Sequence, residues 1–264
     1  MRPFRILFIT QEDPFYVRLF FEEFFKYYAP MEDIQGVVIA PTMGKKSFKA
    51  LLKQMYDFYG ATDFVTMLFR YGYFKACDIL SQLVPLKRFY SITGLCNHYH
   101  IPVRNCPNVN SEIFLQDIRT LNLELIVSVA APQIFKDELI KIPRFGCINI
   151  HNAKLPRYRG MLPNFWQMYH GETAVGTTIH RINAGIDDGE ILLQKETALL
   201  PGESLDSIIK RTKTLGGLLM IEAINGIKEN TLKPLPNLVR ESTYFTFPTK
   251  QDVSEFRRRG YRII

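Results

Sequence analysis

The feature that most constrains the fold is an alternation of short apolar runs with amphipathic stretches of helical period. Residues 5–10 (RILFIT) form a β-branched apolar run, which is typical of a strand. Asp13-Pro14 follows, a helix start with an N-cap candidate and proline at the first helical position. Residues 36–41 (GVVIAP) then predict a buried parallel strand. Between these strands, apolar residues of helical spacing are Val17, Phe20, Phe21, Phe24 and Tyr28.

The same alternation continues after residue 102. Strands are expected at 102–106, 123–129, 146–151, 176–182 and 191–196. Helices are expected at 110–120, capped by Asn110, at 164–169 and at 204–225. Together these elements predict an α/β fold with a mostly parallel twisted sheet and helices on both faces, Rossmann-like in type.

Two segments depart from this alternation. Residues 47–99 have helical period and many aromatic side chains, which predicts an inserted helical subregion. Ordinary helix packing is the favoured explanation of these aromatics, and a docking surface for a lipid-linked or protein partner is the alternative. We expect one α/β domain over residues 1–226 and a short basic C-terminal tail over 227–264, without a full β-barrel domain.

Composition excludes several classes of protein. The chain has 264 residues, of which 47% are hydrophobic, enough to bury a core without a disulfide or metal. No run approaches the ~18 apolar residues of a membrane span, and the first apolar run ends at Gln11-Glu12-Asp13, so no secretory signal is expected. The four cysteines lie far apart without a C-x-x-C pair. These features predict a cytoplasmic protein without a metal site.

Positive charge gathers near the end of the sequence. The net charge is +7, and residues 250–264 carry five Lys and Arg against two acidic side chains. A solvated helix face is the favoured explanation. The alternatives are attraction of nucleic acid, of anionic lipid or of an acidic substrate.

The turn after the first strand argues against a dinucleotide cofactor. Residues 10–13 (TQED) contain no glycine and place two carboxylates where a pyrophosphate would sit. Residues 44–47 (GKKS) lack the earlier glycine of a phosphate loop. We therefore interpret them as a basic surface loop that could contact an acidic part of a substrate.

The stretch 146–194 carries the candidate chemistry. Residues two apart on a strand point to the same face, so Asn149 and His151 project together. The strand ends in a loop of the kind that holds ligands in α/β proteins. A second loop, 183–189 (NAGIDDG), has glycines on both sides of a carboxylate pair and can direct Asp187 toward His151.

An amide, an imidazole and a carboxylate in one pocket suit acyl transfer between two nitrogens. His151 could move the proton, and Asp187 could orient the His151 ring and hold that ring in its charged form. Asn149 could donate a hydrogen bond to the oxygen that gains negative charge. Structural hydrogen bonding among these side chains remains an alternative. A nucleophilic pair of Cys147 and His151 is a third reading, against which stands the usual role of a mid-strand thiol in core packing.

The order of motifs in this stretch resembles a known family. The motifs are Asn149-x-His151, Leu155-Pro156-x-x-Arg159-Gly160, Pro163, Gly171, Gly176-x-Thr178 and Ile186-Asp187-x-Gly189. They resemble the signature of the 10-formyltetrahydrofolate-dependent formyltransferases, which include enzymes for methionyl-tRNA, glycinamide ribonucleotide and nucleotide-linked amino sugars. The resemblance covers about residues 100–200 well, the first forty residues only in layout, and the helical insert and tail poorly.

This resemblance implies roles for individual residues. Asn149, His151 and Asp187 match the family's catalytic trio, and 10-formyltetrahydrofolate is the implied co-substrate, with no metal. The segment 127–134 and the turn 183–187 correspond to the two sides of the folate pocket. The implied folate-binding residues are Val127, Ser128, Val129, Ala130, Ala131, Ile134, Asn183, Ala184, Gly185 and Ile186.

The acceptor is less defined. Ala153-Lys154 and Asp188 replace residues usual in the family, and these changes could reshape the amine side of the pocket. In the family that these motifs resemble, enzymes for methionyl-tRNA carry a C-terminal β-barrel and those for glycinamide ribonucleotide begin with a glycine-containing phosphate turn. The resemblance therefore implies that the short tail and the TQED turn favour a small primary amine, an amino sugar on a nucleotide diphosphate, and no nucleic-acid partner is expected. Candidate substrate-binding residues are Lys45, Lys154, Arg159 and Gly160. A methionyl-tRNA enzyme, a folate-binding protein without turnover and a homo-oligomer remain open.

Overall fold

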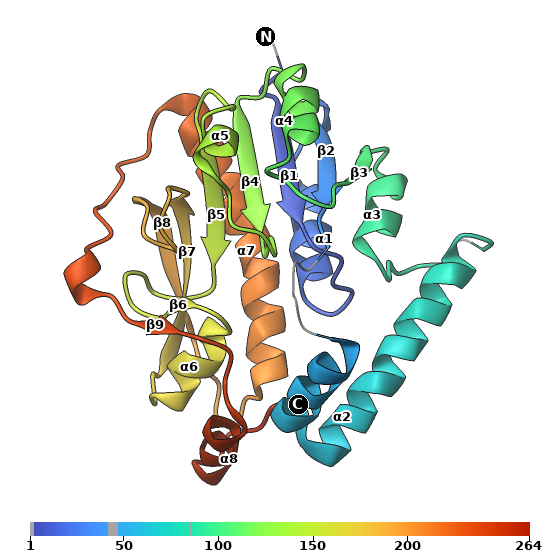
Figure 1. Ribbon diagram of the computed structural model, residues 1–264, viewed down its shortest axis with the longest axis vertical. Coiled ribbons are helices and arrows are strands. Elements are labelled where there is room, and N and C mark those ends of the chain that lie inside the picture. Colours follow the sequence, from blue (N-terminus) through green and yellow to red (C-terminus); the bar gives the residue numbers. More distant parts are fainter. Residues whose placement is uncertain (1–2, 42–46, 85) are drawn as a thin grey trace.

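The computed structural model describes residues 3–41, 47–84 and 86–264 (Figure 1). A seven-stranded sheet has the order β3-β2-β1-β4-β5-β7-β8. The first five are parallel, and β7 and β8 run antiparallel, which confirms the predicted mostly parallel sheet. The strands are β1 (Ile6–Thr10), β2 (Ile34–Ile39), β3 (Val103–Asn105), β4 (Leu125–Val129), β5 (Cys147–His151), β7 (Ala174–Arg181) and β8 (Ile191–Ala198).

Helices cover both faces of this sheet, as predicted. Helices α1 (Val17–Tyr27), α3 (Ile92–His98) and α7 (Leu205–Glu229) share one buried cluster with Ile6 and Phe8 of β1. On the other face, α4 (Glu112–Arg119) and α5 (Asp137–Ile140) pack with Leu7 and Ile9. Alternate residues of β1 therefore enter opposite clusters, because side chains along a strand alternate between its faces.

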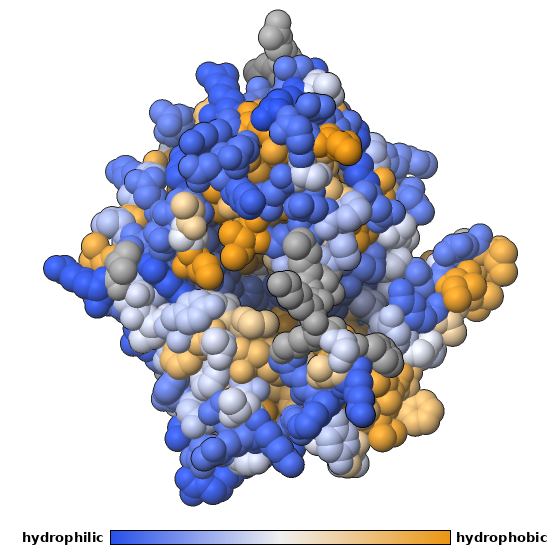
Figure 2. Space-filling model, viewed as in Figure 1, coloured by the Kyte–Doolittle hydropathy of each residue, from blue (hydrophilic) through white to orange (hydrophobic). Residues whose placement is uncertain are grey.

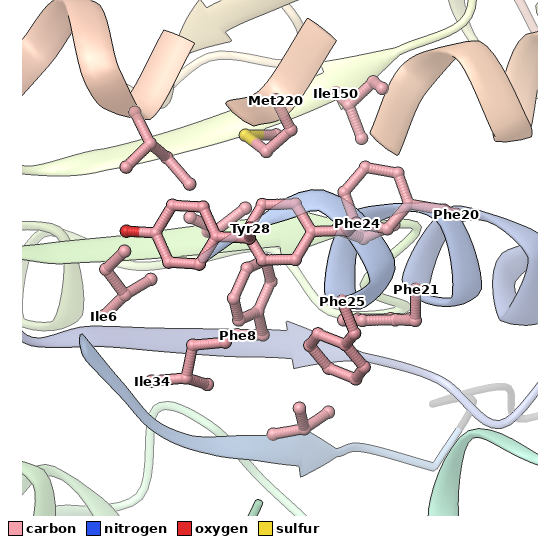
Figure 3. Close-up of a cluster of buried hydrophobic side chains, with 14 of the residues drawn as sticks. Ile6, Phe8, Phe20, Phe21, Phe24, Phe25, Tyr28, Ile34, Ile150 and Met220 are labelled. Atoms are coloured by element: carbon pink, nitrogen blue, oxygen red, sulfur yellow. The ribbon is translucent and has the colours of Figure 1, made fainter. Parts of the chain in front are cut away.

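Aromatic side chains of α1 fill the larger cluster (Figure 3). The ring of Phe24 lies 5.0 Å from that of Phe8 on the sheet and 4.8 Å from that of Tyr28. Helix α7 closes over them at Gly217, where an added Cβ would lie 2.7 Å from the Phe20 carbonyl oxygen. Glycine here allows the two helices to approach closely.

A third cluster lies beyond the carboxyl ends of β1, β4 and β5 (Figure 1). It combines α2 (Phe48–Ser81), α6 (Pro163–Tyr169) and α8 (Lys250–Arg258) with a two-stranded sheet of β6 (Arg159–Gly160) and β9 (Tyr244–Phe245). The rings of Phe165 and Phe256 stack at 4.5 Å. Two short 3-10 turns, η1 (Met31–Asp33) and η2 (Val239–Glu241), complete the elements.

The C-terminal segment packs against this third cluster. Phe256 of α8 and Ile263 are both buried in it. Helix α7 continues past position 226 to Glu229, so the expected division between 1–226 and 227–264 falls within a helix. The two-part organisation itself stays a prediction.

Two predicted helix starts are wrong. Helix α1 begins at Val17, because the Asp13 carboxylate accepts from the backbone N–H groups of Phe15 and Tyr16 and holds a turn ahead of the helix. Ser111, not Asn110, occupies the N-cap position of α4. The Asn110 side chain instead binds the backbone of Ile134 and Lys136.

Within the described ranges, no helix is long and apolar enough to cross a membrane. All four cysteines are free. The described residues hold no cluster of three or more His, Cys, Asp or Glu side chains that could bind a metal ion.

Candidate active site

Strands β5 and β7 place three polar side chains together at the carboxyl end of β5. Asn149 and His151 lie two residues apart on β5, and the antiparallel register sets His180 of β7 opposite Asn149. The Nδ2 atom of Asn149 is 3.1 Å from Nε2 of His180. His151 and His180 are buried, whereas Asn149 is half-buried.

Asp187 joins this group from the loop between β7 and β8. Its Oδ2 lies 3.5 Å from Nδ1 of His151, and its Oδ1 lies 3.6 Å from Nε2 of His180. The backbone N–H of Gly160 donates to Oδ2 at 3.0 Å. Asp187 has φ +50°, a left-handed conformation that Asp tolerates better than most residues. The four side chains Asn149, His180, Asp187 and His151 form a continuous polar chain, called the polar cluster below.

The hydrogen bonds at the two rings assign their protons. Nε2 of His151 donates to the Tyr158 carbonyl at 2.8 Å, because a carbonyl can only accept. Nδ1 of His180 likewise donates to the Arg181 carbonyl at 2.8 Å. In neutral rings, Nε2 of His180 therefore accepts from Asn149, and Nδ1 of His151 presents a lone pair toward Asp187.

Burial and charge act in opposite directions on His151. Burial lowers the pKa of His151, and the Asp187 carboxylate offsets only part of that effect. Desolvation therefore outweighs the attraction of Asp187 in the resting protein, and the expected stabilisation of the charged ring by Asp187 stays a prediction. A positive charge on Lys213 of α7 lowers the pKa of His151 further.

Asp187 stays ionised despite its burial. Burial alone would raise its pKa, but the charge that His151 carries when protonated and the Gly160 N–H together hold the pKa of Asp187 below its ordinary value. The cluster thus pairs a neutral imidazole with a fixed carboxylate.

The C-terminal segment fixes the Asp187 loop in place. Nδ2 of Asn237 donates at 3.0 Å to each of the carbonyls of Asp187 and Gly189. The guanidinium of Arg159 donates to Oδ1 of Asn237 at 2.9 Å. Arg159 is buried and holds the loop through Asn237, and its predicted role toward an acceptor substrate stays a prediction.

The other predicted substrate residues are placed differently from one another. Lys45 lies outside the described residues. The Lys154 ammonium forms an ion pair with Glu196 of β8. Gly160 holds the Asp187 carboxylate, and with φ +94° and the Phe245 carbonyl against it, it has no space for a side chain.

The predicted folate segments have unequal access. Val127, Ser128 and Val129 belong to β4 and are buried, so only their backbone could face a ligand. The Thr10 hydroxyl donates to the Val129 carbonyl at 2.7 Å. Ala130 and Ala131 are half-buried and Ile134 is 67% exposed. On the second loop, Asn183, Ala184, Gly185 and Ile186 are all exposed.

Sequence reasoning missed His180 and Asn237. His180 lies two residues after Thr178 on a recognised strand, and only the pairing of β7 with β5 sets it beside Asn149. Asn237 lies 50 residues from Asp187 and gave no local signal. A nucleophilic role for Cys147 finds no support, because burial raises the pKa of its thiol well above its ordinary value.

The fold and this cluster define an α/β protein with a polar acid–base site at the carboxyl ends of its strands. Residues 85–224, just over half of the chain, match the formyl transferase family. The chain therefore belongs to the formyl transferase family, as the motifs in its sequence predict.

Two relatives illustrate the match in sequence. A methionyl-tRNA formyltransferase of Syntrophus aciditrophicus is 36% identical over 154 residues, which are 58% of this chain and 49% of the relative. One of Trichlorobacter lovleyi is 38% identical over 143 residues, 54% of this chain and 45% of the relative. This chain spans about half the length of the curated relatives it matches.

Solved structures share the fold at low identity. A sugar N-formyltransferase from a Shewanella species aligns with a TM-score of 0.57 at 20% identity, over 92% of this chain and 76% of the other. Glycinamide ribonucleotide transformylase 1 from Symbiobacterium toebii aligns with a TM-score of 0.58 at 14% identity, over 88% and 94%. These likenesses establish the fold and leave the acceptor open.

Proposed function

We propose that this protein transfers a formyl group from 10-formyltetrahydrofolate to a primary amine. The observation that carries the proposal is the polar cluster, with Asp187 3.5 Å from His151 and Asn149 3.1 Å from His180. Membership of the formyl transferase family supplies the reaction class. The exposed isoleucines 134 and 186 on the two flanking loops are apolar surface suited to a pterin ring.

The reaction requires one proton to move from the acceptor amine to N10 of the folate. When bound, the folate supplies a formyl carbon attached to its N10. The bond from that carbon to the acceptor nitrogen forms, the bond to N10 breaks, the amine loses a proton and N10 gains one. His151 is suited to this transfer, because its low pKa leaves Nδ1 free to accept a proton. Asp187 then stabilises the charged ring.

Asn149 is placed to stabilise negative charge on the formyl oxygen. Nε2 of His180 accepts one hydrogen of the Asn149 amide and so orients that amide. The second N–H can then point to the substrate. Removing a single donor of this kind costs ~2.7–4 kcal/mol of transition-state stabilisation in other enzymes.

For the acceptor we favour an amino sugar carried on a nucleotide diphosphate. The support comes from four arginines of the C-terminal segment, each of which already has a protein partner. Arg257 pairs with Asp63, Arg258 and Arg259 pair with Glu255, and Arg262 donates to the Gly202 carbonyl. Binding of tRNA depends on cations free to contact phosphates, so these pairs favour a small acceptor.

Methionyl-tRNA is the second candidate acceptor. The relatives described above carry that name at 36% and 38% identity, although the shared half of their length could serve any acceptor. A folate-binding role without turnover is the non-enzymatic alternative. A cytoplasmic location stays a prediction.

One assay separates these candidates. The protein is incubated with 10-formyltetrahydrofolate and, in parallel, a panel of nucleotide-linked amino sugars, glycinamide ribonucleotide and methionyl-tRNA, and tetrahydrofolate release is followed. Release that depends on an amino sugar is the expected result, and dependence on methionyl-tRNA would transfer the proposal to the second acceptor. Folate binding without release on any acceptor would contradict the enzymatic proposal.

A further inference from the structure

Helix α2 presents an apolar face that no described part of the chain covers. Its backbone breaks at Gly60, which has φ +69° and ψ 174°, and the second half runs outward along the edge of the molecule (Figure 1). Hydrophobic atoms gather at its projecting end (Figure 2). Among its described apolar side chains the most exposed is Phe69, at 77%, and Leu83, two residues past the end of the helix at Ser81, is 80% exposed. The family match begins at residue 85, so it does not account for this helix.

The exposed apolar residues of α2 follow a regular spacing. From residue 61 to residue 83, exposed apolar or small residues follow one another at steps of four, three and four residues, a pattern that repeats every eleven positions. In a helix with about 100° of rotation per residue, these positions lie within about 80° of the helix circumference. Phe69 and Leu80 lie along one edge of this line. Its members, all exposed and called the α2 stripe below, are Ala61, Val65, Leu68, Gly72, Ala76, Ile79 and Leu83.

The opposite face of the same helix is fixed to the body of the protein. Met67 and Phe74 are buried, and the Phe74 ring lies 5.4 Å from that of Phe15. Arg70 pairs with Asp206 of α7 at 3.4 Å. The α2 stripe is therefore a separate surface, held outward by a helix that already has its own packing.

The positions of the stripe are symmetric about Gly72, so the stripe can pair with a second, antiparallel copy of itself. For each member four, seven or eleven residues before Gly72, another member lies the same number of residues after it. In an antiparallel pair of helices crossing at Gly72, Leu68 would oppose Ala76 of a second copy and Ala61 would oppose Leu83. Val65 would oppose Ile79. Two of these pairings set a large residue against a small one, the third sets two β-branched residues together, and Gly72, where a Cβ would meet no atom within 4 Å, leaves room at the crossing for close approach.

We propose that the α2 stripe is a homodimer interface in which two copies of α2 pack antiparallel about Gly72. Such a two-fold contact is isologous, so each pairing occurs twice. The large side chains of the stripe, together with Phe69 and Leu80 beside it, are 46–80% exposed. Their exposed surface is on the order of 700 Å² per copy, close to the ~800 Å² that each partner buries in a standard interface. The stripe contains no charged residue, which favours a protein partner over an anionic bilayer.

The test is the oligomeric state in solution, measured by sedimentation velocity over a range of concentrations. The protein is expected to be a dimer. Val65→Glu is expected to give monomers, because it places a charge in the apolar seam. Ile113→Glu, at a residue 83% exposed on α4, is the matched control and should remain dimeric. Ala76→Glu is a second probe in case Val65→Glu fails to fold.

A double variant tests the antiparallel arrangement. Val65→Glu combined with Ile79→Lys sets opposite charges against each other twice in the proposed pair, and should restore the dimer. In a parallel pair the same variant would oppose like charges. A monomeric parent protein, a Val65→Glu protein that remains dimeric, failure of the double variant to restore dimers, or a monomer that sediments with anionic vesicles would each overturn the proposal.

Discussion

Each ring nitrogen of His151 faces an oxygen, and the two oxygens differ in what they do. The Tyr158 carbonyl fixes the proton on Nε2 and therefore the tautomer, whereas Asp187 faces the nitrogen that changes protonation. Burial keeps that nitrogen unprotonated at rest. The attraction between the Asp187 carboxylate and the His151 ring is strongest after the ring has accepted the proton. Asp187 therefore stabilises the charged state formed during the reaction more than the resting state, as catalysis requires.

Replacing Asn149 by Ala should lower kcat by roughly 10²–10³-fold, since it removes a donor to the oxygen that gains charge. The dissociation constant for tetrahydrofolate should change little, because the amide acts on the reacting group. Steady-state kinetics and folate titration measure both quantities. Asn97→Ala, at an exposed position on α3, is the control and should match the parent protein. A kcat within a few fold of the parent value would count against this role.

Replacing Lys213 by Met should move the acid limb of the pH profile of kcat/KM to higher pH. Activity requires neutral His151, so it is lost as the pH falls through the pKa of that ring. The charge on Lys213 lowers the pKa of His151, and its removal therefore raises that pKa. Burial lowers the pKa of Lys213 to about 8, so it is mostly charged where the limb lies.

The control for this profile is Lys141→Met, at the exposed residue that follows α5, which should leave the acid limb in place. A Lys213→Met limb that stays unchanged or moves to lower pH would show that His151 is not the group that titrates.

At the scale of elements, the site depends on loops held by residues far away in the chain. The strands could be predicted to within about two residues, because β-branched runs bounded by turn residues are local signals. Asn149 and His151 lie two residues apart on one strand, so the sequence predicts that both side chains point to the same face of the sheet. His180 and Asn237 reach the cluster through strand pairing and through the C-terminal segment, and neither contact has a local pattern in the sequence.

The short strand β6 links two of these elements. Gly160 pairs with β9 and donates its N–H to Asp187. Gly160→Ala should lower kcat at least ~10-fold, since even a 1 Å displacement of a catalytic group can cost ~10²-fold. Kinetics and urea unfolding are the measurements.

Gly146→Ala is the matched control for Gly160→Ala. Gly146 also has positive φ, at +74°, but a Cβ there would meet no atom within 4 Å. Its substitution should cost ~1–2 kcal/mol in free energy of unfolding through backbone strain, with kcat preserved. Equal losses of kcat in both variants would show that strain alone, and not the Asp187 contact, explains the effect.

At the scale of the whole molecule, a hydrophobic cluster on each face supports the sheet, and the C-terminal segment contacts the loop of the site. Helices α1 and α7 pack on the sheet through the aromatic cluster of Figure 3. Asn237 of the C-terminal segment stabilises the Asp187 loop through hydrogen bonds to the carbonyls of Asp187 and Gly189. The outward half of α2 takes part in neither, which is why packing periodicity predicted its helix but not its exposed stripe.

Phe24→Ala tests the contribution of this cluster to stability. The Phe24 side chain is fully buried, so its removal should lower the free energy of unfolding by ~3–5 kcal/mol through lost burial and the cavity left behind. Tyr27→Ala in the same helix, at a side chain 53% exposed, should change it by less than ~1 kcal/mol. Equal effects in urea unfolding would contradict the assignment of the core.

The most direct test of the account is the rate of tetrahydrofolate formation by a His151→Asn variant, measured in single turnover beside its affinity for tetrahydrofolate. The account predicts a rate reduced by roughly 10²–10⁴-fold, the contribution of a positioned acid–base group, with folate affinity within about two-fold of the parent protein. A rate close to that of the parent protein would contradict proton transfer through His151.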